Sequence, residues 1–96
     1  MAAYLFGKLT VTNPSWLPEY TERVTKLLAD AGAKYHVKST KTIMVEGDGP
    51  PPSATIIIEF PTLEIAKDWY HSPEYGELIE LRKDGATAEL FIADGV

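Results

Sequence analysis

The segment Ala54–Phe60, which reads ATIIIEF, constrains the fold more than any other part of the chain. Its nearly continuous run of β-branched residues is typical of a strand buried on both faces, and therefore of a central strand. The segment lies between Pro52 and Pro61, and proline cannot donate a hydrogen bond to a strand ladder. We therefore expect a central strand that the remaining elements must cover or extend.

Three other segments are rich in aromatic and β-branched residues and are predicted to be strands: Ala3–Thr12, Ala33–Lys38 and Ala86–Ala93. A further short strand is predicted at Thr42–Glu46. It precedes the loop 47–53, whose glycines and consecutive prolines exclude regular pairing.

Alternation along the first strand divides its side chains between two faces of a sheet. Leu5 and Leu9 share the face that would pack on helices. Tyr4 and Phe6 share the other face, whose mixed character suits a cavity wall or a contact between subunits.

Three helices are predicted from apolar spacing and from capping residues. The first begins at an N-cap, Ser15, and ends at Gly32; the second follows Thr62. The third combines a serine cap, a proline and an acid in Ser72–Glu74, and Gly85 ends it. The resulting order, β-α-β-β-α-β, predicts an α+β ferredoxin-like sandwich with a four-stranded antiparallel sheet.

The length of the chain bounds its organisation. Ninety-six residues suffice for one domain, which we expect to span residues 1–96. The core of so small a domain is thin, and without cysteine the chain has no disulfides to stabilise it. Because the strands are apolar on both faces, we expect a homodimer in which the second face of the sheet is covered.

The charge balance narrows the classes of partner. The formal net charge is −5, with 14 acidic and 9 basic residues, and no basic stripe suggests a nucleic-acid partner. The longest pure apolar run, Ile56–Ile58, is far too short to cross a bilayer, so no membrane association is expected. With no targeting segment visible, the expected location is cytoplasmic.

The central motif VEGDGPP, the junction IIIEFPT and the segment AKDWYHSPEY together resemble family 1330 of uncharacterised domains, and the likeness extends over nearly the whole chain. That family belongs to the dimeric α+β-barrel group of ferredoxin-like proteins. The resemblance implies a two-fold dimer with facing sheets and outer helices. Wider relatives include cofactor-independent monooxygenases, isomerases and cyclases, so the fold alone does not supply a function.

Three side chains are candidate catalytic groups. Glu59, in the central strand, could act as an acid or base if it is desolvated, or it could be a structural carboxylate paired at the strand end. His36 could shuttle protons, or it could be an ordinary histidine of the sheet. Arg82 could hold an anionic ligand at the mouth of a pocket, or it could pack structurally. His36 and His71 have no metal-binding spacing, and no metal or cofactor is predicted.

We expect a ligand pocket between the sheet and the helices, in which His36, Glu59 and Arg82 are the polar groups able to orient a ligand. Its predicted lining is aromatic, with core packing as the alternative for the tryptophans and tyrosines: Tyr4, Phe6, Trp16, Tyr20, Trp69, Tyr70 and Tyr75. Ser53 and the prolines before it are expected to gate entry. The hypothesis is a cofactor-independent enzyme acting on a small, largely apolar organic molecule. The alternatives are a non-catalytic binding or sensing module and a structural dimer.

Overall fold

A computed structural model describes residues 1–96. In chain order the elements are β1 (Ala3–Val11), a short 3₁₀ helix (Pro14–Trp16), α1 (Leu17–Asp30), β2 (Lys34–Ser39), β3 (Ala54–Phe60), α2 (Leu63–Tyr70), α3 (Pro73–Arg82) and β4 (Ala86–Asp94). None of the helices is both long enough and apolar enough to span a bilayer.

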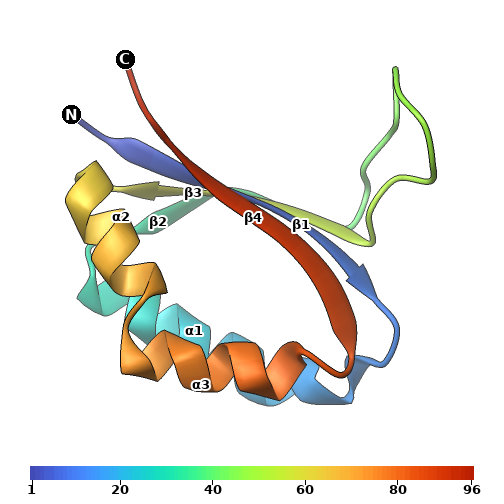
Figure 1. The fold of residues 1–96 in the computed structure, drawn as a ribbon, viewed down its shortest axis with the longest axis horizontal. Coiled ribbons are helices and arrows are strands. Elements are labelled where there is room, and N and C mark those ends of the chain that lie inside the picture. Colours follow the sequence, from blue (N-terminus) through green and yellow to red (C-terminus); the bar gives the residue numbers. More distant parts are fainter.

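The four strands form one antiparallel sheet in the order β2-β3-β1-β4, and all three helices lie against one of its faces (Figure 1). β1 and β3 are the two inner strands, which confirms the central position predicted for the apolar run. The α+β ferredoxin-like fold is therefore confirmed. We call the face without helices the outer face of the sheet.

Two of the three predicted N-terminal helix caps are confirmed. Thr62 and Ser72 cap α2 and α3, and each side-chain oxygen accepts a hydrogen bond from the backbone N–H three residues later. The prediction of Ser15 as the N-cap of the first helix is wrong. The side chain of Asn13 accepts from the N–H of Ser15 instead, because a turn of 3₁₀ helix precedes α1.

The strand predicted at Thr42–Glu46 is also wrong, since the segment between β2 and β3 carries no regular structure. It forms a long loop that rises from the sheet on the outer side (Figure 1). The physical reason is that the β2–β3 ladder ends with Ser39 opposite Thr55, so a continuation of β2 would face Pro51 and Pro52, which cannot donate to a ladder. Thr42 is tied to the sheet by a side-chain hydrogen bond to Thr55, with 2.6 Å between the hydroxyl oxygens.

The main core lies between the helices and the sheet. Its largest fully buried side chains are Phe60, Leu5 and Leu78. The ring of Phe60 packs on Trp69 at 5.4 Å between centroids, and Trp69 packs on Tyr75 at 4.3 Å. Aromatic side chains from β3, α2 and α3 therefore hold the layers together.

Gly85 lies where the chain leaves α3, and its carbonyl accepts from the N–H groups of Thr12 and Asn13. A Cβ atom there would lie 2.4 Å from the Trp16 ring and 2.5 Å from the carbonyl oxygen of Asn13. We expect Gly85→Ala to lower the free energy of unfolding by about 1–3 kcal/mol, because backbone must move to admit the methyl group.

Gly76 provides the matched control for that substitution in a urea titration. No atom lies within 4 Å of a Cβ placed there, inside α3. Gly76→Ala should therefore raise stability, by about 0.5–1 kcal/mol. Equal effects of the two alanines would contradict the steric account of Gly85.

Candidate functional site

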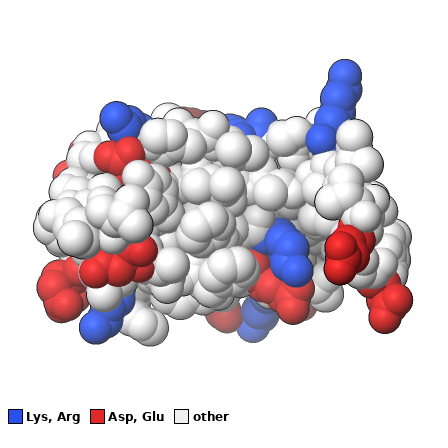
Figure 2. Space-filling model, turned by 90° about the horizontal axis from the view of Figure 1, so that it is seen from above, with Lys and Arg blue, Asp and Glu red and all other residues white.

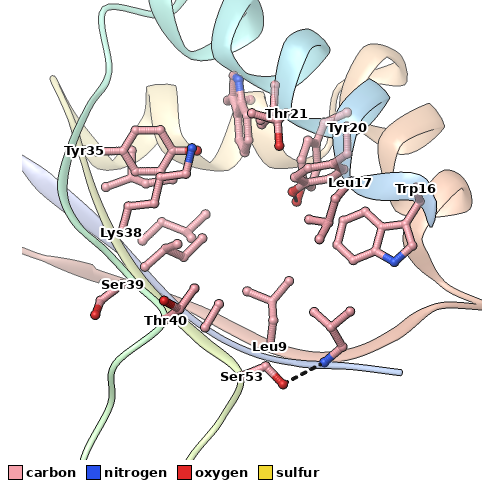
Figure 3. A pocket seen from close by; sticks show the side chains of 18 residues that line it. Leu9, Trp16, Leu17, Tyr20, Thr21, Tyr35, Lys38, Ser39, Thr40 and Ser53 are labelled. Carbon is pink, nitrogen blue, oxygen red and sulfur yellow. Dashed lines mark hydrogen bonds between the residues drawn. The ribbon is translucent and has the colours of Figure 1, made fainter. Parts of the chain in front are cut away.

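A pocket of about 420 Å³ lies between the sheet and α1 (Figure 3). Thirteen of its 18 lining residues are hydrophobic, so its wall is largely apolar. The helix contributes Leu17, Tyr20 and Val24, and the floor includes Leu9 and Ile56 from the inner strands. In size and character it resembles the concave sites that bind small molecules, which measure roughly 300–1,000 Å³.

The exposed lining residues mark where this pocket meets solvent. They are Thr21 on α1, Lys38 at the end of β2, and Thr40 and Ser53 at the two ends of the long loop. The hydroxyl oxygen of Ser53 accepts from the N–H of Val11 at 3.1 Å, which ties the loop to the end of β1. The exposed part of the lining is therefore polar, whereas the interior is largely apolar.

Two tyrosines form the main polar group inside the pocket. The hydroxyls of Tyr20 and Tyr75 are hydrogen-bonded to each other at 2.8 Å. Burial, reinforced by the neighbouring Tyr75, raises the pKa of Tyr20 well above its ordinary value. Both the location and this shift favour a neutral hydroxyl at physiological pH, which can donate or accept a hydrogen bond but is a poor base.

Arg82 lies behind these tyrosines and is only 6% exposed. It forms no salt bridge, and its Nε–H has no hydrogen-bond partner. Burial disfavours the charged guanidinium, but the oxygens of Tyr75 and Tyr20 outweigh that effect and raise the pKa of Arg82. A buried cation without a carboxylate partner therefore adjoins the polar end of the pocket, although Arg82 itself does not line it.

The structure brings His36 and Glu59 together, but on the outer face of the sheet. The imidazole Nε2 lies 2.7 Å from a carboxylate oxygen of Glu59, and the ring of Tyr4 packs edge-on against His36 with centroids 5.8 Å apart. Placing them with Arg82 in one pocket was therefore wrong. The sheet separates them, because alternation along a strand sends neighbouring side chains to opposite faces.

Of the seven aromatic side chains predicted to line a ligand pocket, four line this cavity. Trp16, Tyr20, Trp69 and Tyr75 do line the pocket. Tyr4 and Phe6 do not, because they project from β1 on the outer face. Tyr70 does not line the pocket either; its ring packs against Tyr75 with centroids 5.5 Å apart.

Two residues on β2, Tyr35 and Lys38, line the pocket although the sequence did not predict them as lining residues. The register of β2 against β3 shifts between Tyr35 and Val37, so that Val37 lies opposite Ile57 and Lys38 opposite Ile56. This bulge turns Lys38 to the same face as Tyr35, with the ammonium nitrogen 5.0 Å from the ring centroid (Figure 3). Strict alternation predicts the opposite face, and no local sequence signal marks the bulge.

The outer face carries a row of apolar side chains that crosses all four strands at one level. The pairing register aligns them in the order Val37, Ile57, Phe6 and Phe91. The rings of the two phenylalanines stack at 5.2 Å, and Phe91 is 54% exposed. Uncharged surface covers most of the middle of this face, and charged side chains lie mainly toward its edges (Figure 2).

Beyond the row, Lys8 pairs with Glu89 at 3.3 Å between nitrogen and oxygen. A shallow hollow beside this pair is lined mainly by polar residues and by Met44 and the prolines of the long loop. No group of three or more histidine, aspartate or glutamate side chains is arranged to hold a metal ion.

Several solved structures share the fold at low sequence identity. A protein of unknown function from Rhodopseudomonas palustris superposes with a TM-score of 0.80 at 13% identity, covering 99% of this chain and 82% of that one. SnoaB, a cofactor-independent oxygenase from Streptomyces nogalater, has a TM-score of 0.66 at 9% identity, with coverages of 99% and 93%. A dimeric ferredoxin-like protein of unknown function from Bacteroides fragilis has a TM-score of 0.63 at 11% identity, with coverages of 98% and 96%.

At such identities these likenesses show the fold alone. No curated protein matches the sequence. The family model described as a domain of unknown function, DUF1330, matches residues 2–96, so the chain belongs to that family.

Proposed function

We propose that this protein binds a small, largely apolar organic molecule in the pocket between the sheet and α1, and acts on it without a cofactor. The observation that carries the proposal is the pocket itself. A wall of 13 hydrophobic residues surrounds about 420 Å³, while most lining atoms that can hydrogen-bond lie at the mouth or on the tyrosine pair. Small-molecule sites combine these same features.

The chemistry available inside this pocket is hydrogen bonding rather than nucleophilic attack. The hydroxyls of Tyr20 and Tyr75 can orient a carbonyl or hydroxyl group of the occupant. An apolar, water-poor site of this kind suits a reaction that the bound molecule largely performs itself. The similarity to SnoaB supports the proposal as an analogy, because that protein is an oxygenase that needs no cofactor.

A non-catalytic binding module is the second candidate. The observation that favours it is that no carboxylate or histidine lines the pocket, since His36 and Glu59 lie on the outer face. The two candidates differ in the fate of the occupant. If the protein is an enzyme, the bound molecule is converted in air, and Tyr20→Phe or Tyr75→Phe lowers the rate of conversion more than the affinity for the molecule. If it is a binding module, the molecule is recovered unchanged.

We also propose that the protein acts as a homodimer in which two outer faces meet. The apolar row with charged edges has the anatomy of an interface, with an apolar core and a polar rim. The dimeric protein from Bacteroides fragilis, which has the same fold, supports a dimeric state by analogy.

Occupancy of the pocket can be tested by blocking it. We expect N-phenyl-1-naphthylamine, a neutral dye that fluoresces in apolar sites, to bind the protein in a saturable manner. Thr21 is exposed and lines the mouth, so Thr21→Trp should lower the affinity for the dye at least about tenfold by filling the space, with little effect on the core.

The matched control for this experiment is Thr25→Trp, one turn further along α1. Thr25 is exposed and does not line the pocket, so its substitution should leave dye binding unchanged. Absence of saturable binding, or equal loss in the two variants, would remove the support for a ligand site between sheet and helix.

A further inference from the structure

The lining of the pocket carries a single charge, and that charge is positive. Of its 18 lining residues, Lys38 is the one that carries a charge. The chain holds 14 acidic residues, yet none of them lines the pocket. In a protein with a net charge of −5, this local excess of positive charge distinguishes the pocket from the rest of the molecule.

Lys38 has no carboxylate partner of its own. Lys8, Arg23 and Lys83 form salt bridges with glutamates, but Lys38 does not. Its ammonium instead lies 5.0 Å from the centroid of the Tyr35 ring, at the mouth of the pocket and across from Leu17 and Tyr20 (Figure 3). The group is therefore held near the entrance while its hydrogen-bond donors stay free for a ligand.

The buried guanidinium of Arg82 acts in the same direction from the far side. It lies next to the hydroxyls of Tyr75 and Tyr20, and no carboxylate neutralises it. Interactions between charges are screened less in an apolar interior than in water. A cationic ligand would be repelled from both ends of the pocket, whereas an anionic ligand would be attracted.

We propose that the occupant of this pocket is an organic carboxylate with an apolar body, whose anionic group binds Lys38 at the mouth while its body fills the interior. This inference rests on the proposed function and adds the chemical class of the ligand. The apolar wall binds the apolar part of the ligand, and the ammonium of Lys38 favours anionic ligands over neutral or cationic ones. The bulge in β2 is what delivers that lysine to the pocket.

The test compares two probes of the same shape, 2-naphthoate and the neutral 2-naphthylmethanol, by isothermal titration calorimetry. The wild-type protein should bind the carboxylate about fivefold more tightly, as expected for a partly exposed ion pair, and added salt should reduce the preference. Lys38→Met keeps the apolar stem and should remove most of the preference, leaving only the part that Arg82 supplies, without lowering the affinity for the alcohol. Lys38→Arg should retain it.

Lys34→Met is the matched control, because Lys34 is an exposed lysine on the same strand that does not line the pocket. It should leave both affinities unchanged. Equal affinity of the wild-type protein for the two probes would overturn the carboxylate assignment, and a preference undiminished in Lys38→Met would overturn the role of Lys38. If the neutral dye still binds and Thr21→Trp still blocks it, the proposed pocket function stands. If neither dye nor probes bind, both proposals fail.

Discussion

Replacement of Ile57 by aspartate is expected to convert the proposed dimer into a folded monomer. Ile57 lies in the middle of the apolar row on the outer face, between Val37 on β2 and Phe6 on β1. In one chain it is only partly buried, so an aspartate there can remain hydrated and the core stays intact. In a two-fold dimer two such carboxylates would be buried together without partners.

The expected loss is large because an unpaired buried charge costs about 3–5 kcal/mol. Each step of about 1.4 kcal/mol is a factor of ten in the dissociation constant, so dimerisation should weaken at least about a hundredfold. Light scattering at micromolar concentration would give the monomer mass, with an unchanged far-ultraviolet circular dichroism spectrum.

Thr10→Asp is the control for this experiment, since Thr10 is exposed on the same face of β1 but lies outside the apolar row. It should leave the dimer largely intact. A wild-type monomer, or an aspartate variant that keeps the dimer mass, would show that the outer face is not an interface. Unfolding of the Ile57 variant would contradict the folded monomer and would mean that the chain needs this face covered in order to fold.

Replacement of Phe60 by alanine is expected to lower the free energy of unfolding by about 3–5 kcal/mol. Phe60 is fully buried at the end of β3 and packs on Trp69 of α2 at 5.4 Å between ring centroids. Loss of the ring leaves a cavity that the surrounding aromatic side chains cannot close. Because small domains are stable by only about 5–15 kcal/mol, this single change removes a large part of the total.

Thermal unfolding provides the measurement. A loss of about 3 kcal/mol corresponds to a fall of at least ~12 °C in the midpoint for a domain of this length. Ile65→Ala also truncates a large apolar side chain, on α2, but Ile65 is 37% exposed, so the midpoint of this variant should change far less. Equal falls in the two variants would show that Phe60 is not central to the core.

The elements and their order followed from local chemistry in the sequence. The run ATIIIEF gave a central strand with the bounds Ala54–Phe60, because β-branched residues between prolines have few other ways to fold. The serine, proline and glutamate at Ser72–Glu74 predicted the start of α3 for a similar reason. Capping and alternation depend on neighbours along the chain, and these are visible in any sequence.

For the aromatic residues of the candidate site, too, the local pattern indicated which face of the sheet each one occupies. Trp16, Tyr20 and Trp69 have apolar helical spacing, which correctly predicted that they face the sheet and its pocket. For Tyr4 and Phe6 the alternation of β1 already indicated the other face. Assigning them to the helix-side pocket disregarded that pattern, and the structure shows that the pattern was right.

What only the tertiary structure decided is which side chains from different elements meet. The sequence separates His36 from Glu59 by 23 residues, and the pairing of β2 with β3 brings them together on the outer face. The bulge between Tyr35 and Val37 turns Lys38 into the pocket, and packing of α3 buries Arg82 behind two tyrosines. The physical reason is that register, bulges and burial arise from contacts between distant segments, whereas propensities and caps arise from contacts between neighbours.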